Sequence, residues 1–128
     1  MKILGIGTDI VDINRIKNII KKNADFKKRI FSKNEIHFCK KKKNNYSCLA
    51  KRFAAKEAFS KALGTGISLG LSFNEIEVIN NKSGKPSFKI TGNSLEITKK
   101  RTKCKKINTF LSLSDEKKFA LATVIIAN

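Results

Sequence analysis

The chain has 128 residues, of which 41% are apolar, enough for a hydrophobic core, and its length predicts one domain over residues 1–128. Its apolar N-terminus is too short for a signal peptide or a membrane span and is interrupted by Asp9, which excludes both within this sequence. We therefore expect a cytoplasmic protein; the alternative is a chain whose transit peptide has already been removed.

Lysine and arginine number 28 against 10 aspartates and glutamates, which gives a net charge of +18. Such a charge favours a polyanionic partner: nucleic acid, a membrane surface, a nucleotide or an acidic protein. The competing interpretation is compositional drift, because the chain is rich in Lys, Asn and Ile, as a biased genome produces at exposed positions.

The three cysteines, Cys39, Cys48 and Cys104, are odd in number and form no C-x-x-C pair. This pattern argues against a disulfide framework or a zinc site and favours a reducing compartment. His37 has no metal-ligand spacing and is expected on a helix surface.

The N-terminal half predicts one strand and several helices. Residues 2–10 alternate as a strand, and two glycines remove side chains on the face of Asp9, so another backbone or a ligand can approach closely. Asp12 is placed to cap a helix of about ten residues. Further helices are expected at 25–30, after Ser32 (a capping box with Glu35) and at 47–63, with an exposed lysine-rich loop at 40–45.

The C-terminal half predicts strands at 73–80 and 87–90 around a turn, a basic amphipathic helix at 93–102, and a hairpin of strands 107–114 and 119–126. The expected fold class is α+β, with a mostly antiparallel sheet packed against a long helix and shorter helices.

The long helix carries the candidate chemistry. Glu57 and Lys61 lie four residues apart, where an ordinary surface ion pair is the simplest interpretation. Arg52 and Lys56 could likewise form a solvated basic edge. Gly64-Thr65-Gly66 follows the helix directly, and successive amides in such a turn can bind an anion. For Asp9, the alternative to a ligand-binding role is that it caps a turn or a helix.

Two segments resemble the signatures of holo-acyl-carrier-protein synthases. The first runs from Gly5 to Ile16 as GIGTDIVDINRI, and the second from Arg52 to Ile67 as RFAAKEAFSKALGTGI. The segments FNEIEV, GKP and LSLSD, followed by ALATVI near the C-terminus, fit the same family in the same order. The resemblance covers essentially the whole chain.

This resemblance implies a 4'-phosphopantetheinyl transferase with that family's fold. Such enzymes move the phosphopantetheine arm of coenzyme A onto a serine of apo acyl carrier protein, depend on Mg²⁺, and release adenosine 3',5'-bisphosphate. The activity supports fatty acid biosynthesis. The family's bacterial synthases form homotrimers with active sites between subunits.

The resemblance also implies roles for individual residues. Asp9 and Glu57 would bind the metal and, with Lys61, form the catalytic group. The nucleotide would be seated by Arg52, Lys61, Gly64, Thr65, Gly66, Lys85 and Pro86. The base for the carrier serine would be Glu57 or Asp9, directly or through a water, with Glu116 a weaker candidate. Many relatives have His where this chain has Asp115, so that histidine's role is not transferred, and Asp115 is expected to begin a hairpin turn.

Acyl carrier proteins are acidic, and members of this family bind them with a basic surface. The resemblance therefore implies that the basic N-terminal helices bind the carrier. Arg15, Lys22, Phe26 and Arg29 are the expected contacts, with Lys21 beside them, and opposite charge would speed the encounter. A solvated helix face with a core phenylalanine is the alternative.

Two other function classes compete with this enzyme. The net charge would suit a nucleic-acid-binding module, but the chain has no Trp and one Tyr, lacks a stacking motif, and would place Asp9 and Glu57 against phosphate. A structural trimer without activity would have no need of Asp9, Glu57 and Lys61. We therefore expect no nucleic-acid partner.

Overall fold

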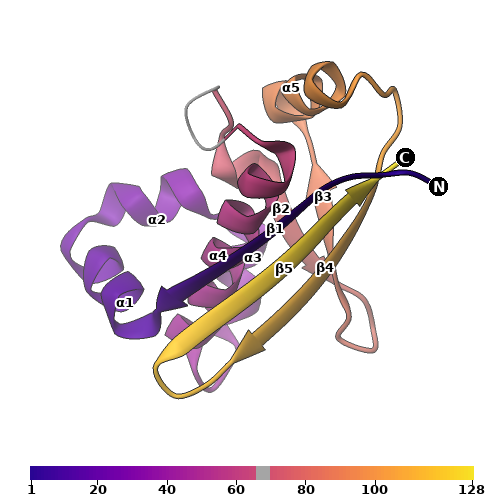
Figure 1. The fold of residues 1–128 in the computed structure, drawn as a ribbon. Helices are drawn as coiled ribbons and strands as arrows, with labels where there is room; N and C mark the ends of the chain where they lie inside the picture. Colours follow the sequence, from indigo (N-terminus) through magenta and orange to yellow (C-terminus); the bar gives the residue numbers. More distant parts are fainter. Residues whose placement is uncertain (66–69) are drawn as a thin grey trace.

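The computed structural model describes residues 1–65 and 70–128, which form two antiparallel sheets and five α-helices (Figure 1). One sheet has the strand order β1-β5-β4 and the other pairs β2 with β3. This confirms the predicted α+β class. In chain order the elements are β1 (Ile3–Asp12), α1 (Ile13–Lys22), α2 (Ala24–Ile30), α3 (Lys33–Lys40), α4 (Asn45–Leu63), the 3₁₀ turn η2 (Phe73–Glu75), β2 (Ile76–Asn80), β3 (Pro86–Ile90), α5 (Gly92–Thr102), β4 (Asn108–Asp115) and β5 (Phe119–Ala127).

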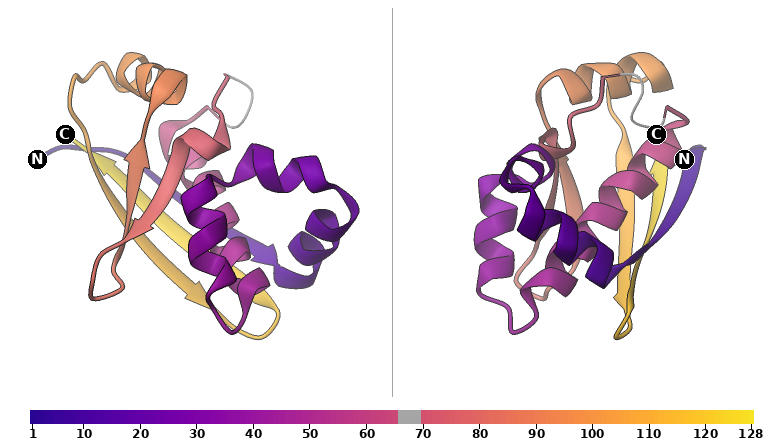
Figure 2. Two further views of the ribbon diagram at one scale, coloured as in Figure 1. Left: turned by 180° about the vertical axis from the view of Figure 1, so that it is seen from behind. Right: turned by 90° about the vertical axis from the view of Figure 1, so that its left-hand side faces the viewer.

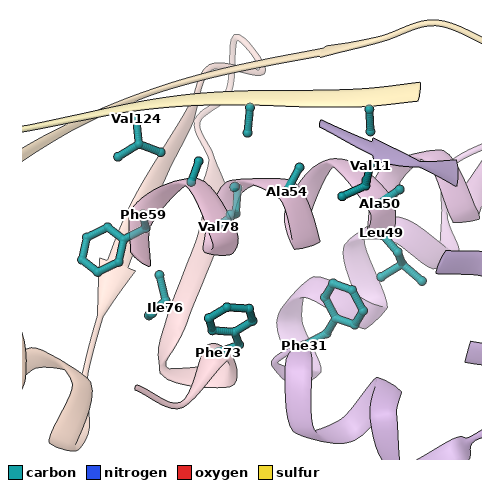
Figure 3. Packing of buried hydrophobic residues seen from close by; sticks show 14 of the residues in the cluster. Val11, Phe31, Leu49, Ala50, Ala54, Phe59, Phe73, Ile76, Val78 and Val124 are labelled. Atoms are coloured by element: carbon teal, nitrogen blue, oxygen red, sulfur yellow. The ribbon is translucent and has the colours of Figure 1, made fainter. Parts of the chain in front are cut away.

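The long helix α4 is the centre of the fold. It packs against one face of the three-stranded sheet, while α1 and α2 lie beside one end of it and α5 lies at the other (Figures 1 and 2). Figure 3 shows Val124 on the sheet side of α4 and Phe31, Phe73 and Ile76 on the opposite side. Because α4 is covered from both sides, 13 of its 19 residues are buried.

Two glycines let β1 approach α4 at backbone distance. A Cβ added to Gly7 would lie 1.9 Å from the carbonyl oxygen of Ala58, and one added to Gly5 would lie 1.9 Å from that of Ala62. The predicted close approach is therefore confirmed, and α4 meets it with a face of alanines. This contact sets how far Asp9, the next residue on the same face of β1, stands from the helix.

Replacing Gly7 with Ala should destabilise the protein by about 3 kcal/mol, because the added methyl collides with backbone that no rotamer change can move. Urea denaturation would measure the loss. Ser87→Ala, at an exposed position of β3, is the matched control and should change stability by less than about 0.5 kcal/mol. A Gly7→Ala protein as stable as the control would mean that β1 and α4 lie farther apart.

The helix caps agree closely with the sequence. Asp12 caps α1 by accepting the Arg15 amide, and Ser32 with Glu35 forms the predicted capping box of α3. Helix α4 begins at Asn45, two residues earlier than predicted, because the Asn44 side chain accepts the Ser47 amide. His37 is exposed on α3 as expected.

Two local predictions are wrong. Residues 73–75 form a 3₁₀ turn in place of the first part of a strand, and the Glu75 carboxylate there accepts the amides of Asn93 and Ser94 at the start of α5. Cys39 and Cys48 form a disulfide, although the cysteine pattern argued against one. The cause is tertiary: the short loop between α3 and α4 brings their Cα atoms within 5.5 Å.

Arg52 and Lys56 are buried, which excludes the alternative that they form a solvated basic edge of α4. Lys56 is fully buried and its ammonium donates to the Glu35 carboxylate at 2.7 Å and to the carbonyls of Phe73 and Ile76. Arg52 is 2% exposed. Burial lowers the pKa of Lys56, and the charge of Glu35 opposes that effect. The pair ties α3, η2 and β2 to the middle of α4.

Within the described residues no helix is long and apolar enough to cross a membrane.

Candidate active site

Asp9 and Lys61 meet where β1 crosses α4. The Lys61 ammonium lies 3.0 Å from Asp9 Oδ1 and donates to the Thr8 carbonyl at 3.1 Å. The second oxygen of Asp9, Oδ2, is buried and has no hydrogen-bond partner among residues 1–65 and 70–128. Asp9 does not cap α1, since Asp12 does. Burying a carboxylate oxygen without a hydrogen-bond donor costs free energy, unless a bound ligand or cation interacts with that oxygen.

Glu57 belongs to the same electrostatic group. Burial raises the pKa of its carboxyl above the usual value, and the charge of Asp9 raises it further. Lys61 and Arg15 act in the opposite direction with smaller effects. The structure therefore brings Asp9, Glu57 and Lys61 together from β1 and α4, with Arg15 of α1 close enough to act on Glu57.

These residues fit a magnesium ion. Mg²⁺ in phosphate-transfer sites keeps several waters and is held by one or two carboxylates together with the phosphates of the substrate. Two mutually repelling carboxylates, one with an unpartnered buried oxygen, supply that donor set. Among the described residues no group of three or more His, Cys, Asp or Glu side chains could hold a metal by itself, so an ion here would need ligands from water and substrate.

A cavity of about 410 Å³ opens beside Glu57. Its walls are mainly apolar, and two expected carrier contacts, Phe26 and Arg29 of α2, line it together with Glu57. The Phe26 ring also packs against Phe53 of α4, with centroids 6.0 Å apart. Arg15 and Lys22 are exposed on α1. Phe26 and Arg29 therefore lie on the same side of α4 as Glu57. We call this space the α2 cavity; it is lined by Phe26, Arg29, Ile30, Phe53, Glu57, Leu71, Ser72, Phe73 and Asn74.

A second cavity, of about 470 Å³, lies on another side of α4. Arg52 is five residues before Glu57, which turns it about 140° around the helix axis. Its guanidinium donates to the Asn80 side chain and stacks over Phe38 at 4.4 Å, while its Nε is buried without a hydrogen-bond partner in the described part of the chain. We call this space the basic cavity; it is lined by Phe38, Lys42, Lys43, Asn44, Ser47, Cys48, Lys51, Arg52, Asn80, Gly84, Pro86, Leu113 and Asp115.

The other residues expected to contact the nucleotide lie in different parts of the structure. Pro86 lines the basic cavity, and Lys85, beside it in the exposed hairpin turn, is not among the lining residues. Gly64 ends α4 in a left-handed conformation with φ of 77°, and the Arg101 guanidinium donates to its carbonyl at 3.0 Å. Thr65 is buried. Gly66 lies outside the described residues. One chain thus does not bring Arg52 and Pro86 to Asp9 and Glu57.

Asp115 does more than begin a turn. It ends β4 and accepts hydrogen bonds from Ser47 Oγ at 2.8 Å and from Lys51 Nζ at 3.2 Å. The Ser47 hydrogen bond lowers the pKa of Asp115 most, with Lys51 adding to the effect. Asp115 therefore fixes one wall of the basic cavity. Sequence reasoning missed Ser47, Lys51, Lys42 and Lys43 as cavity residues; the only signal was the lysine run, which was interpreted as a solvated loop.

Comparisons with known proteins identify the family of this chain. Residues 5–124 match the family model described as the 4'-phosphopantetheinyl transferase superfamily. The chain is 56% identical to a holo-[acyl-carrier-protein] synthase of Pelagibacter ubique over 98% of both chains. It resembles the crystal structure of that synthase from Neisseria meningitidis, with a TM-score of 0.85, 39% identity and coverage of 99% and 100% of the two chains.

A third relative carries a ligand. The holo-(acyl-carrier-protein) synthase of Bacillus anthracis, crystallised in complex with CoA (3',5'-ADP), matches with a TM-score of 0.79 and 38% identity over 98% of this chain and 97% of that one. The family match over most of the chain and the high full-length identity lead to one conclusion. This chain belongs to the holo-[acyl-carrier-protein] synthases, transferases of the 4'-phosphopantetheinyl transferase superfamily.

Proposed function

We propose that this chain transfers the 4'-phosphopantetheine arm of coenzyme A to a serine of apo acyl carrier protein in a Mg²⁺-dependent reaction, and that it serves fatty acid biosynthesis. The other product is adenosine 3',5'-bisphosphate. The observation that carries the proposal is the meeting of Asp9, Glu57 and Lys61 at the edge of the α2 cavity. A cytoplasmic location and a single domain over residues 1–128 remain part of the proposal.

Each residue of this group has a role that follows from its chemistry. Asp9 and Glu57 would hold Mg²⁺, which when bound would offset the negative charge of the coenzyme A pyrophosphate. Lys61 is 54% exposed at its side chain, so its ammonium can turn from Asp9 toward a phosphate oxygen and stabilise charge that develops during transfer. Glu57, with its raised pKa, is the better placed of the two acids to accept the serine proton.

The two cavities support an active site shared between chains. Arg52 and Pro86 line the basic cavity, and Glu57 lines the α2 cavity, so one nucleotide reaching both sets needs a second copy. The outer face of the three-stranded sheet supports such an assembly, because it exposes large apolar side chains that form a patch suited to a subunit interface. The large exposed apolar side chains of β1, β4 and β5 include Ile6, Ile10, Phe110, Phe119 and Leu121.

Sedimentation equilibrium tests the homotrimer that we propose. The wild-type chain should sediment at three times its 14.3 kDa mass, and Ile10→Glu should dissociate it by placing charge in the apolar face. A wild-type protein that stays monomeric at micromolar concentration would contradict the shared site.

The activity itself is tested by incubating the chain with coenzyme A, Mg²⁺ and an apo carrier protein. Mass spectrometry should show the carrier heavier by one phosphopantetheine arm, and chelation of the metal should stop the reaction. A carrier that stays unmodified under all metal conditions would sink the proposal.

The basic surface of α2 gives a prediction about the carrier. Arg29→Glu should raise the KM for the acidic carrier by about tenfold and leave the KM for coenzyme A unchanged, because charge complementarity governs encounter. Lys100→Glu makes the same charge change on exposed α5 and should have little effect. Equal losses in the two variants would mean that overall charge, and not this surface, attracts the carrier.

A further inference from the structure

The disulfide between Cys39 and Cys48 spans the lysine-rich loop between two helices. Cys39 lies in the last turn of α3 and Cys48 near the start of α4, nine residues apart in sequence. Both side chains are buried, at 0% and 5% exposure. The bond therefore fixes the ends of the segment that contains Lys42 and Lys43.

The same bond forms part of the basic cavity. Cys48 lines that cavity, and so do Lys42, Lys43 and Arg52. The Arg52 guanidinium lies 3.6 Å from Cys48 Sγ. The disulfide thus stands between two sources of positive charge in the cavity, the lysines of the loop and the arginine of α4, and determines how they are held relative to each other.

We propose that the Cys39–Cys48 disulfide is a redox-modification site that controls how tightly the basic cavity binds nucleotide phosphates. The inference rests on the proposed function for the identity of the ligand, an adenosine bisphosphate or coenzyme A. Disulfides in the cytosol of mesophiles are usually transient and either catalytic or redox-sensing. The proposed cytoplasmic location therefore makes this bond a candidate for regulation.

The reaction is ordinary thiol–disulfide exchange with a dithiol reductant. A reductant thiolate attacks Cys48 Sγ, because Cys48 lines the cavity and Cys39 does not, and the Cys39 sulfur leaves and takes up a proton. The second reductant thiol then attacks the mixed disulfide and releases Cys48. The protein gains two electrons, Cys39 takes up one proton, Cys48 is released as a thiolate, and the reductant gives its other proton to solvent and ends as its own disulfide.

Reduction weakens phosphate binding in two ways. The loop that carries Lys42 and Lys43 loses its covalent tether, so ordering it for a ligand costs conformational entropy that the disulfide had already removed. The thiolate released at Cys48 also lies beside Arg52 and offsets the charge that Arg52 offers to a phosphate. The oxidised chain is therefore the tighter binder.

Calorimetric titration with adenosine 3',5'-bisphosphate tests this coupling, because that nucleotide has no thiol that could react with the disulfide. Incubation of the wild-type protein with dithiothreitol should raise the Kd about tenfold, within the usual range of coupling between sites. Cys104→Ser, which removes the free cysteine, should respond in the same way. Cys39→Ser and Cys48→Ser should bind weakly with and without reductant.

Linkage requires the reverse effect as well. Saturating nucleotide should favour the disulfide over the dithiol by the same factor of about ten, measured by thiol counting in a dithiothreitol redox buffer. These two measurements use wild-type protein, so they do not depend on how the serine variants fold. Equal Kd values in the oxidised and reduced protein would overturn the redox inference and leave the proposed function intact, whereas binding in neither state would overturn both.

Discussion

Replacing Glu57 with Gln should lower the rate of phosphopantetheine transfer by about 10³-fold. The amide keeps the size of the side chain but removes one of the two charges that would hold Mg²⁺, and the loss of several kcal/mol of charge stabilisation corresponds to a change of this order. The measurement is single-turnover transfer to the apo carrier, followed by mass. Glu96→Gln, at an exposed position of α5, makes the same change away from the site and is the matched control that should keep full activity.

The stability of this variant separates catalysis from folding. The folded-state pKa of Glu57 is raised, so its contribution to stability is fully present below the unfolded-state pKa and is lost as the pH rises through the folded-state value. Without metal, Glu57→Gln should therefore unfold at a higher temperature than the wild type above that pH, and the difference should shrink toward pH 4. A variant that is inactive because it is destabilised would show the opposite order of melting temperatures.

Replacing Lys56 with Met should destabilise the protein by about 3–5 kcal/mol, the usual cost of leaving one partner of a buried ion pair uncompensated. The Glu35 carboxylate would keep the amides of Ser32 and Val78 but would lose its counter-charge. The carbonyls of Phe73 and Ile76 would also lose their shared donor. Chemical denaturation at neutral pH would measure the change.

Two further variants make this result specific. Lys51 lies on the same helix as Lys56 and forms an ion pair with Asp115 of β4, but its side chain is 29% exposed. Lys51→Met should therefore cost less than about 1 kcal/mol. The double variant Glu35→Gln with Lys56→Met removes the buried charge and keeps an acceptor oxygen for only one of the two amides, so it should recover part of the loss. A Lys56→Met protein no less stable than Lys51→Met would mean that the buried pair adds little.

Local features of this fold could be predicted because their causes are local. The caps at Asp12 and Ser32 involve partners within three residues, and the alternation of β1 places its glycines on the face that meets α4. The start of α4 was predicted two residues late because Ser47 and Asn44 are both capping residue types, and only the geometry selects Asn44.

Features that depend on distant segments could not be predicted. Nothing in the spacing of Cys39 and Cys48 shows that two helices fold back and bring the sulfurs together. In the sequence, Lys56 resembles a surface lysine. In the structure its ammonium is paired with the carboxylate of Glu35, 21 residues away. The family resemblance predicts the grouping of Asp9 with Glu57. The structure adds that Arg52 lines a different cavity, which a linear motif does not reveal.

The central claim is that Asp9 and Glu57 together hold one divalent cation. The most direct measurement is Mn²⁺ titration followed by electron paramagnetic resonance, with Mn²⁺ replacing Mg²⁺, on the wild type, Asp9→Asn and Glu57→Gln in the presence of coenzyme A. We expect one bound ion per site in the wild type and loss of that binding in each variant. Unchanged Mn²⁺ binding in both variants would contradict the claim.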